Sequence, residues 1–183
     1  MMIDQENIQN LFVKKEYDKA LIIVEDNLIS NKNNIFLLNV KGMIHAAKNE
    51  HEESINCFEE CVKIDATKDA LFANLGFSYM ALNDIDKAIE NFSLSIKLND
   101  KAPKNLTAIA KLYIKKNDLK SAKTYLEKAL KIEPNSTENY INIGGIQFKE
   151  NKFVEAEASF RKAIELNPDI PEAHSNLGKT LKE

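Results

Sequence analysis

Apolar residues follow two helical patterns along this chain, and both patterns return every 34 residues. Within each repeat of this length, the first pattern occupies positions 4, 7, 8 and 11, which lie on one face of a helix. The second pattern occupies positions 17, 20, 24, 27, 28 and 30. In the fourth repeat the first pattern consists of Leu106, Ile109, Ala110 and Tyr113. Each repeat is therefore predicted to form a pair of helices.

Small residues keep the same period. Four of the five glycines lie at position 8 of their repeats, and Ala110 takes this position in the fourth repeat. Side chains this small let two helix backbones cross closely. The period predicts a single array of repeats over 1–34, 35–68, 69–102, 103–136 and 137–170, with a C-terminal helix at 171–183. Such arrays stack repeat on repeat and mostly serve as binding surfaces.

Asparagine and proline mark the ends and the starts of the predicted helices. Asparagine tolerates the left-handed backbone that ends a helix, and it recurs at position 15. Proline suits the first turn of a helix but stops a helix that reaches it. The asparagines are Asn49, Asn83, Asn117 and Asn151; Pro103 and Pro171 lie at position 1, and Pro134 and Pro168 follow second helices.

This pattern resembles the tetratricopeptide repeat family, whose repeat is two antiparallel helices. The match is clearest in the fifth repeat, with Tyr140, Gly144, Phe153, Ala156, Phe160, Ala163 and Pro168. The resemblance covers essentially the whole chain and implies an all-α fold, a right-handed α-solenoid of antiparallel helix pairs. The first repeat departs from the pattern, because Asp4 and Asn7 lie where apolar residues are expected. A polar first helix suits an N-terminal cap.

The amino-acid composition limits the classes of partner that this chain is expected to bind. The net charge is −3, and the 25 basic residues include one arginine, Arg161, so nucleic acid is not the expected ligand. No apolar run approaches the roughly 20 residues of a membrane span, and the N-terminus lacks a signal-peptide pattern. We therefore expect a cytoplasmic protein. Cys57 and Cys61 are interpreted as packing residues, with half of a metal site as the alternative, because no second ligand pair accompanies them.

The sequence predicts neither catalysis nor a cofactor. His45, His51 and His174 all fall on packing positions of the repeat, and no Ser-His-Asp or Cys-His arrangement is recognisable. The Gly144-Gly145 pair lies inside a helical pattern and lacks the Lys-Ser/Thr of a phosphate-binding loop. We expect a protein that is not an enzyme.

The resemblance also implies where a partner would bind. In that family the first helices line a concave groove, with positions 2, 5, 6, 9, 12 and 13 pointing into it. These positions are mostly apolar and all uncharged in the second and third repeats, and lysine occurs at them in later repeats. An exposed apolar patch of this kind indicates an interaction site, with methionine able to adapt to different partners. The predicted groove residues are Phe36, Asn39, Val40, Met43, Ala73, Asn74, Phe77, Met80, Lys104, Lys111 and Asn142.

The sequence thus predicts a non-catalytic scaffold or adaptor whose partner is a protein peptide or amphipathic helix, apolar with an acidic flank. A clamp for chaperone carboxylates is disfavoured, because only Asn74 and Lys104 match its five positions. An asparagine ladder at position 6 is interrupted by Val40 and Ala108. The alternative function is a substrate-recognition or self-association module of a larger enzyme, such as a glycosyltransferase. A homodimer through the C-terminal end near Gly178, and a groove filled by the chain itself, are further alternatives.

Overall fold

Residues 4–183 are described by the computed structural model, so residues 1–3 of the first predicted repeat lie outside the described part. The described residues form eleven helices and no strand. They divide into two compact units, Met1–Asp100 and Lys101–Glu183, and each is described by itself. The all-α fold of antiparallel helix pairs is confirmed, while the joining of all repeats into one array stays a prediction.

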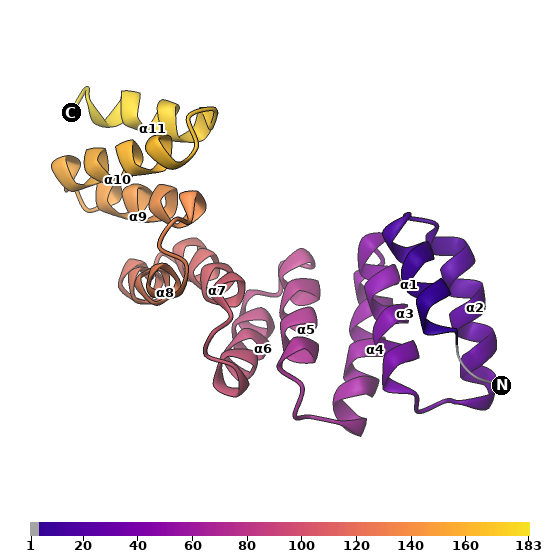
Figure 1. Cartoon of the computed structure of the whole chain (residues 1–183). Coiled ribbons are helices and arrows are strands. Elements are labelled where there is room, and N and C mark those ends of the chain that lie inside the picture. The colour runs from indigo at the N-terminus through magenta and orange to yellow at the C-terminus, as the bar shows by residue number, and fades with distance from the viewer. Residues whose placement is uncertain (1–3) are drawn as a thin grey trace. The chain divides into compact units, whose positions relative to one another are not determined.

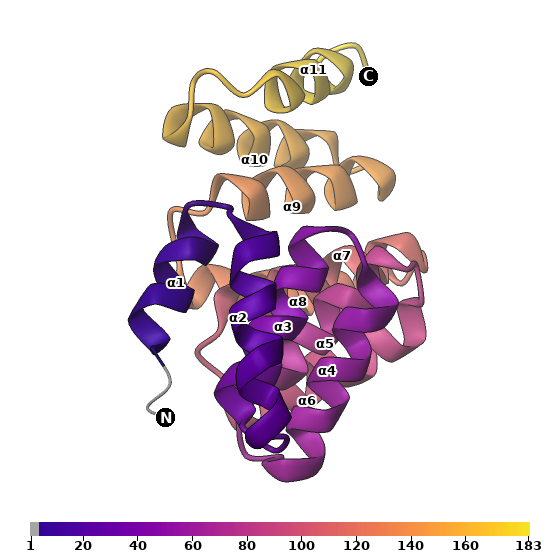
Figure 2. The same cartoon turned by 90° about the vertical axis from the view of Figure 1, so that its right-hand side faces the viewer.

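Both units consist of consecutive helix pairs in which each helix packs against the next along the chain (Figure 1). The first unit contains α1 (Gln5–Val13), α2 (Tyr17–Ser30), α3 (Ile35–Ala47), α4 (His51–Ile64), α5 (Asp69–Ala81) and α6 (Ile85–Leu98). The second contains α7 (Pro103–Lys115), α8 (Leu119–Ile132), α9 (Thr137–Lys149), α10 (Phe153–Leu166) and α11 (Pro171–Thr180). In the second unit α9, α10 and α11 lie side by side in both views (Figures 1 and 2).

The helix starts follow the predicted period. From α3 onward the first helix of every repeat begins at position 1, and from α2 onward every second helix begins at position 17. Only α1 differs, because it starts at Gln5 behind the Asp4 cap, whose carboxylate accepts a hydrogen bond from the Asn7 backbone N–H at 3.0 Å. The sequence pattern therefore predicted both the number of helix pairs and their register.

Position 15 turns the chain between the two helices of each pair. Its residue has a positive φ of 59–63° in five repeats, which is the left-handed region. The residue is asparagine in four of them and Lys15 in the first. Asparagine adopts this conformation with less strain than other residues that carry a Cβ. The predicted role of the asparagines is confirmed.

Positions 8 and 24 share one space where the two helices of a pair cross. A Cβ added to Gly42, Gly76 or Gly144 would lie 2.6–2.9 Å from the ring of Phe58, Phe92 or Phe160, respectively. In the fourth repeat Ala110 stands at position 8, and the smaller Leu126 stands at position 24 in the same core cluster. A large residue on one helix therefore accompanies a small residue on the other. We call this combination the 8/24 pair.

Two polar contacts are buried among the apolar ones. The hydroxyls of Ser54 on α4 and Ser78 on α5 lie 3.0 Å apart. In the second unit the Thr107 hydroxyl donates to the Asn139 side-chain oxygen at 2.8 Å, joining α7 to α9. Both contacts join neighbouring repeats, and each satisfies polar atoms that packing removes from water.

The two adjacent glycines of α9 allow a matched test of the 8/24 pair. Gly144→Ala places a methyl group against the Phe160 ring, and we expect it to lower the free energy of unfolding by about 1–3 kcal/mol. Gly145→Ala is the control, because its Cβ would meet nothing within 4 Å. Alanine also favours a helix interior over glycine by up to about 1 kcal/mol, so the control should be neutral or stabilising. Urea unfolding followed by circular dichroism measures both, and equal stability of the two variants would contradict the shared-space argument.

Candidate functional site

A pocket of about 320 Å³ opens among α1, α3, α4 and α5 of the first unit. It contains three of the predicted groove residues, Met43, Asn74 and Phe77, and no charged carboxylate or ammonium group. We call it the α3/α5 pocket; its lining consists of Phe12, Met43, Ala46, His51, Phe58, Asn74, Phe77 and Ser78. The Phe58 ring, held by the 8/24 pair, forms its buried floor.

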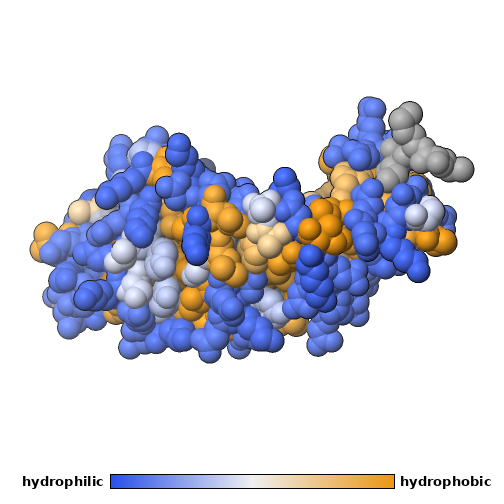
Figure 3. Space-filling view, turned by 90° about the horizontal axis from the view of Figure 1, so that it is seen from below, coloured by the Kyte–Doolittle hydropathy of each residue, from blue (hydrophilic) through white to orange (hydrophobic). Residues whose placement is uncertain are grey.

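Phe77 is the most exposed aromatic part of this pocket. It is 40% exposed, although its ring meets the buried Phe92 ring edge-on with centroids 4.9 Å apart. The edge contact holds Phe77 in place while leaving part of its surface open to solvent. Met43, Met80, Phe36 and Ala73 are each partly buried nearby on α3 and α5. Apolar side chains reach the surface of the molecule in patches bordered by hydrophilic residues (Figure 3).

The two predicted groove asparagines of this unit bind each other. The Asn74 side-chain amide donates to the Asn39 oxygen at 3.2 Å, and the Asn39 amide lies 3.6 Å from the Met43 sulfur. These contacts run from α5 to α3 and fix the rim of the pocket. They also occupy donors that a peptide ligand would otherwise use. Sequence reasoning placed these residues in the groove but did not foresee their pairing.

One residue of the lining has a buried polar atom without a hydrogen-bond partner. His51, at the start of α4, lines the α3/α5 pocket, and its Nδ1 atom is buried with no hydrogen-bond partner. Sequence analysis assigned His51 a packing role only. A buried ring nitrogen left unpaired is costly unless a ligand or water reaches it.

A second pocket, of about 210 Å³, lies among α9, α10 and α11 of the second unit. It is lined by Gly145, Phe148, Lys149, Phe160, Asn176 and Lys179, and we call it the α9/α11 pocket. All of these residues except Phe160 lie at positions that the sequence analysis assigned to the groove. The pocket itself was not predicted; its signal is glycine at position 9, which leaves open the space beside the phenylalanine at position 24.

Family models settle what these repeats are. A tetratricopeptide repeat model matches residues 37–68, 70–101 and 103–136, and a TPR repeat model matches residues 144–183. The chain belongs to the tetratricopeptide repeat family. TPR repeats are typically non-catalytic modules for protein interaction, and the family therefore supports a protein-interaction scaffold. No curated protein sequence matches the chain.

Solved TPR structures share the fold. MamA is 21% identical, with a TM-score of 0.84 over 92% of this chain and 96% of its own. YrrB, a TPR protein with an unusual peptide-binding site, is 18% identical, with a TM-score of 0.79 over 92% of this chain and 87% of its own. The first TPR of Spaghetti, bound to an HSP90 peptide, is 23% identical, with a TM-score of 0.61 over 64% of this chain and 94% of its own. At these identities the likeness concerns the fold alone.

Val40 does not lie where the sequence analysis expected it. It is only 7% exposed and belongs to the core cluster that contains Ile8, Val24 and Leu37. The side chain therefore packs inside the first TPR unit and offers little surface to a partner. The physical reason is the first repeat, whose large residues Ile8 and Phe12 reach α3 and cover position 6 of the second repeat.

The remaining predicted groove residues lie in the second unit. Lys104 is exposed in the first turn of α7. Lys111 is exposed and forms an ion pair with Glu138 at 3.0 Å. Asn142 is partly buried, and its side-chain nitrogen is fully enclosed without a hydrogen-bond partner. Of these three residues only Lys104 and Lys111 present a charge to solvent, and Lys111 is already neutralised by its partner.

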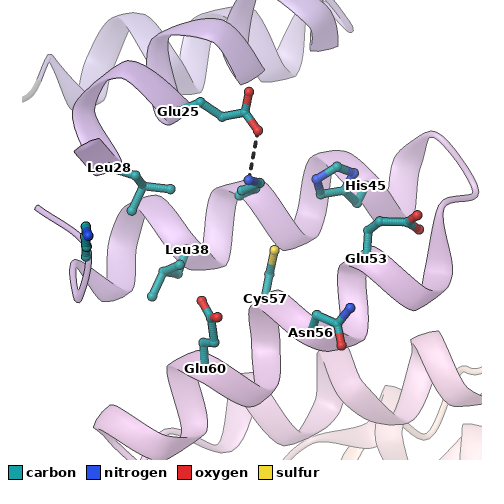
Figure 4. Close-up of a pocket in the computed structure, with 10 residues that line it drawn as sticks. Glu25, Leu28, Leu38, His45, Glu53, Asn56, Cys57 and Glu60 are labelled. Atoms are coloured by element: carbon teal, nitrogen blue, oxygen red, sulfur yellow. Dashed lines mark ion pairs between the residues drawn. The ribbon is translucent and has the colours of Figure 1, made fainter.

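Another pocket of the first unit, of about 560 Å³, lies among α2, α3 and α4 (Figure 4). Its residues on α3 are Leu38, Lys41 and His45, which lie roughly opposite Met43 on the helix. Glu25 of α2 bridges the pocket to Lys41 at 2.8 Å (Figure 4). Among residues 4–183 no group of three or more His, Cys, Asp or Glu side chains is placed to hold a metal ion. The lining of this pocket mixes charged and apolar residues, and two of its charges, Glu25 and Lys41, pair with each other.

The two cysteines lie beside or beneath that pocket. Cys61 is fully buried, and Cys57 is 8% exposed with its sulfur directed toward the space between the helices (Figure 4). Burial raises the pKa of Cys57 to about 11 and, together with the neighbouring Cys57, raises the pKa of Cys61 to about 12. Both thiols are therefore protonated at neutral pH and poorly suited to metal binding or nucleophilic chemistry.

Within the described residues 4–183, none of the helices has both the length and the apolar character needed to cross a bilayer.

The raised pKa values predict inert thiols. With a disulfide reagent near pH 8, both cysteines of the folded chain should react more than about a hundredfold more slowly than a free thiol, and both should react fully in urea. Cys57→Ser and Cys61→Ser variants assign the two signals. The unfolded chain loses its thiol protons first, so stability should fall as the pH rises above the ordinary value of 9.0 toward about 11 to 12. Fast labelling of the native chain would show that the packing interpretation is wrong.

Proposed function

We propose that this TPR protein is a non-catalytic adaptor that binds one segment of a partner protein, a peptide or an amphipathic helix, at the α3/α5 pocket. The observation that carries this proposal is the pocket itself: its volume is about 320 Å³, and most of its lining is apolar. Binding sites are typically concave and largely apolar, with a few polar groups that fix orientation. The polar residues of the lining are His51, Asn74 and Ser78, of which Asn74 also binds Asn39.

The chemistry of the lining supports an apolar ligand. Burying the exposed part of Phe77 and the partly exposed Met43 removes apolar area from water, which contributes about 25 cal/mol per Å². Neither residue takes part in an 8/24 pair, although Phe77 of α5 also packs edge-on against Phe92 of α6. An amphipathic helix that presents residues at i, i+3 and i+4 is the partner geometry that such a surface favours.

A charge-insertion pair tests this proposal. Met43→Lys/Phe77→Lys puts two ammonium groups into the pocket, and Ile22→Lys/Ile29→Lys is the matched control. The control residues are 61% and 75% exposed on α2 of the same unit, outside the pocket, so the change in charge and composition is equivalent. Circular dichroism first establishes that both variants are as helical as the parent chain.

The ligand for this test comes from a displayed peptide library selected on the parent chain. We expect the pocket variant to bind selected peptides at least about tenfold more weakly, a loss of about 1.4 kcal/mol, and the control within about twofold. The ε-methyl NMR signals of Met43 and Met80 should shift when peptide is added to the parent chain. Equal binding by both variants, with unshifted methyl signals, would place the binding surface elsewhere and refute the proposal.

A further inference from the structure

The α9/α11 pocket repeats the α3/α5 pocket in the second unit. Both use position 9, position 12 and the phenylalanine at position 24 of one repeat, with positions 6 and 9 of the next. In the α3/α5 pocket these positions are Met43, Ala46, Phe58, Asn74 and Phe77; in the α9/α11 pocket they are Gly145, Phe148, Phe160, Asn176 and Lys179. The same construction therefore carries a different chemistry in each unit.

Glycine at position 9 gives the α9/α11 pocket its depth. At this position of the third repeat Phe77 lies against Phe92, whereas Gly145 supplies no side chain beside Phe160. A Cβ built on Gly145 would meet nothing within 4 Å, so the space is open rather than filled from another side. The volume of about 210 Å³ is enough for one side chain, since an apolar cavity of about 150 Å³ already holds benzene.

Two lysines border this space without a carboxylate partner. Lys149 and Lys179 line the pocket, and both are exposed. Within residues 4–183 neither forms an ion pair, although Lys111, Lys152 and Lys162 of the same unit do. No acidic residue lines the pocket. Two unneutralised ammonium groups beside an apolar space favour a ligand that combines an apolar group with negative charge.

Asn176 adds a polar group suited to a peptide. It lines the pocket at position 6, and its side-chain amide has no hydrogen-bond partner among the described residues, unlike Asn74 in the first unit. A free amide can both donate to and accept from a peptide backbone. The pocket thus presents an apolar space, a group for main-chain hydrogen bonds and two positive charges.

We propose that the α9/α11 pocket is a second binding site, which takes a single large apolar side chain of a partner peptide flanked by aspartate or glutamate. The apolar side chain enters the space beside Phe148 and Phe160, and the flanking carboxylates pair with Lys149 and Lys179. Lysine is a compact charge on a flexible stem, so the carboxylates need not be held in one fixed geometry. This site lies in a different unit from the α3/α5 pocket and does not depend on the function proposed for it.

Three capped, fluorescein-labelled peptides test the site on the full chain: Asp-Asp-Phe-Asp-Asp, Asp-Asp-Ala-Asp-Asp and Lys-Lys-Phe-Lys-Lys. Fluorescence anisotropy measures their affinities at low and at physiological salt. We expect saturable binding of the first peptide, at least about tenfold weaker binding of the second, and no detectable binding of the third. Binding of the first should weaken as salt rises, because exposed charges are screened.

Two variants locate the binding. Gly145→Leu places a side chain in the pocket, starting from a Cβ that meets nothing within 4 Å, and should weaken binding of the acidic phenylalanine peptide at least about tenfold. Lys149→Glu/Lys179→Glu changes only exposed residues and should abolish binding of that peptide. The Met43→Lys/Phe77→Lys variant should bind it within about twofold of the parent, because those residues belong to the other unit.

Three results would overturn this site. Binding of the acidic phenylalanine peptide that survives both second-unit variants would place the ligand elsewhere. Equal affinity for the phenylalanine and alanine peptides would show that charge attraction alone drives binding and that no side chain enters the pocket. Loss of binding in Met43→Lys/Phe77→Lys alone would assign the peptide to the α3/α5 pocket, which would support the first proposal while refuting this one.

Discussion

Every helix pair of this protein depends on one steric constraint, the limited space shared by positions 8 and 24. The sum of the two side chains stays within that space while the individual residues change. The pairs are Ile8 with Val24, Gly42 with Phe58, Gly76 with Phe92, Ala110 with Leu126 and Gly144 with Phe160. Protein interiors are close-packed, so a gain in volume on one helix must be matched by a loss on the other.

This constraint also decides which residues are free to vary. Position 9 follows position 8 directly, yet its side chain points about 100° away around the helix and leaves the shared space. Methionine, phenylalanine, lysine and glycine all occur there, at Met43, Phe77, Lys111 and Gly145. The result is an apolar pocket in the first unit and a lysine-bordered pocket in the second. Each lies beside the buried phenylalanine at position 24 of its repeat, Phe58 or Phe160. Binding chemistry can therefore change while the 8/24 pair is kept, even where a large position-9 residue such as Phe77 also touches the ring at position 24.

The sequence alone predicted the helix pairs, their register and the turns, because each follows from spacing within a single repeat. It could not predict contacts that depend on which residues meet across repeats. Val40 is buried because Ile8 of the preceding repeat reaches it, and Asn39 and Asn74 bind each other across two helices. The open space at Gly145 was missed for a related reason: a glycine leaves a pocket only if no neighbouring side chain fills it.

Lys15 distinguishes the turn of the first helix pair from the asparagine turns of the other pairs. It holds the left-handed conformation that asparagine takes in the other turns, at a cost of about 1 kcal/mol that asparagine largely avoids. The helix before it, α1, is the shortest of the eleven described helices, and it contributes Phe12 to the wall of the α3/α5 pocket. A short helix beside a strained turn is expected to open locally more readily than the longer helices of the same unit. Local opening of α1 would remove Phe12 from the wall of the pocket, and a ligand that contacts Phe12 would stabilise the closed position of α1.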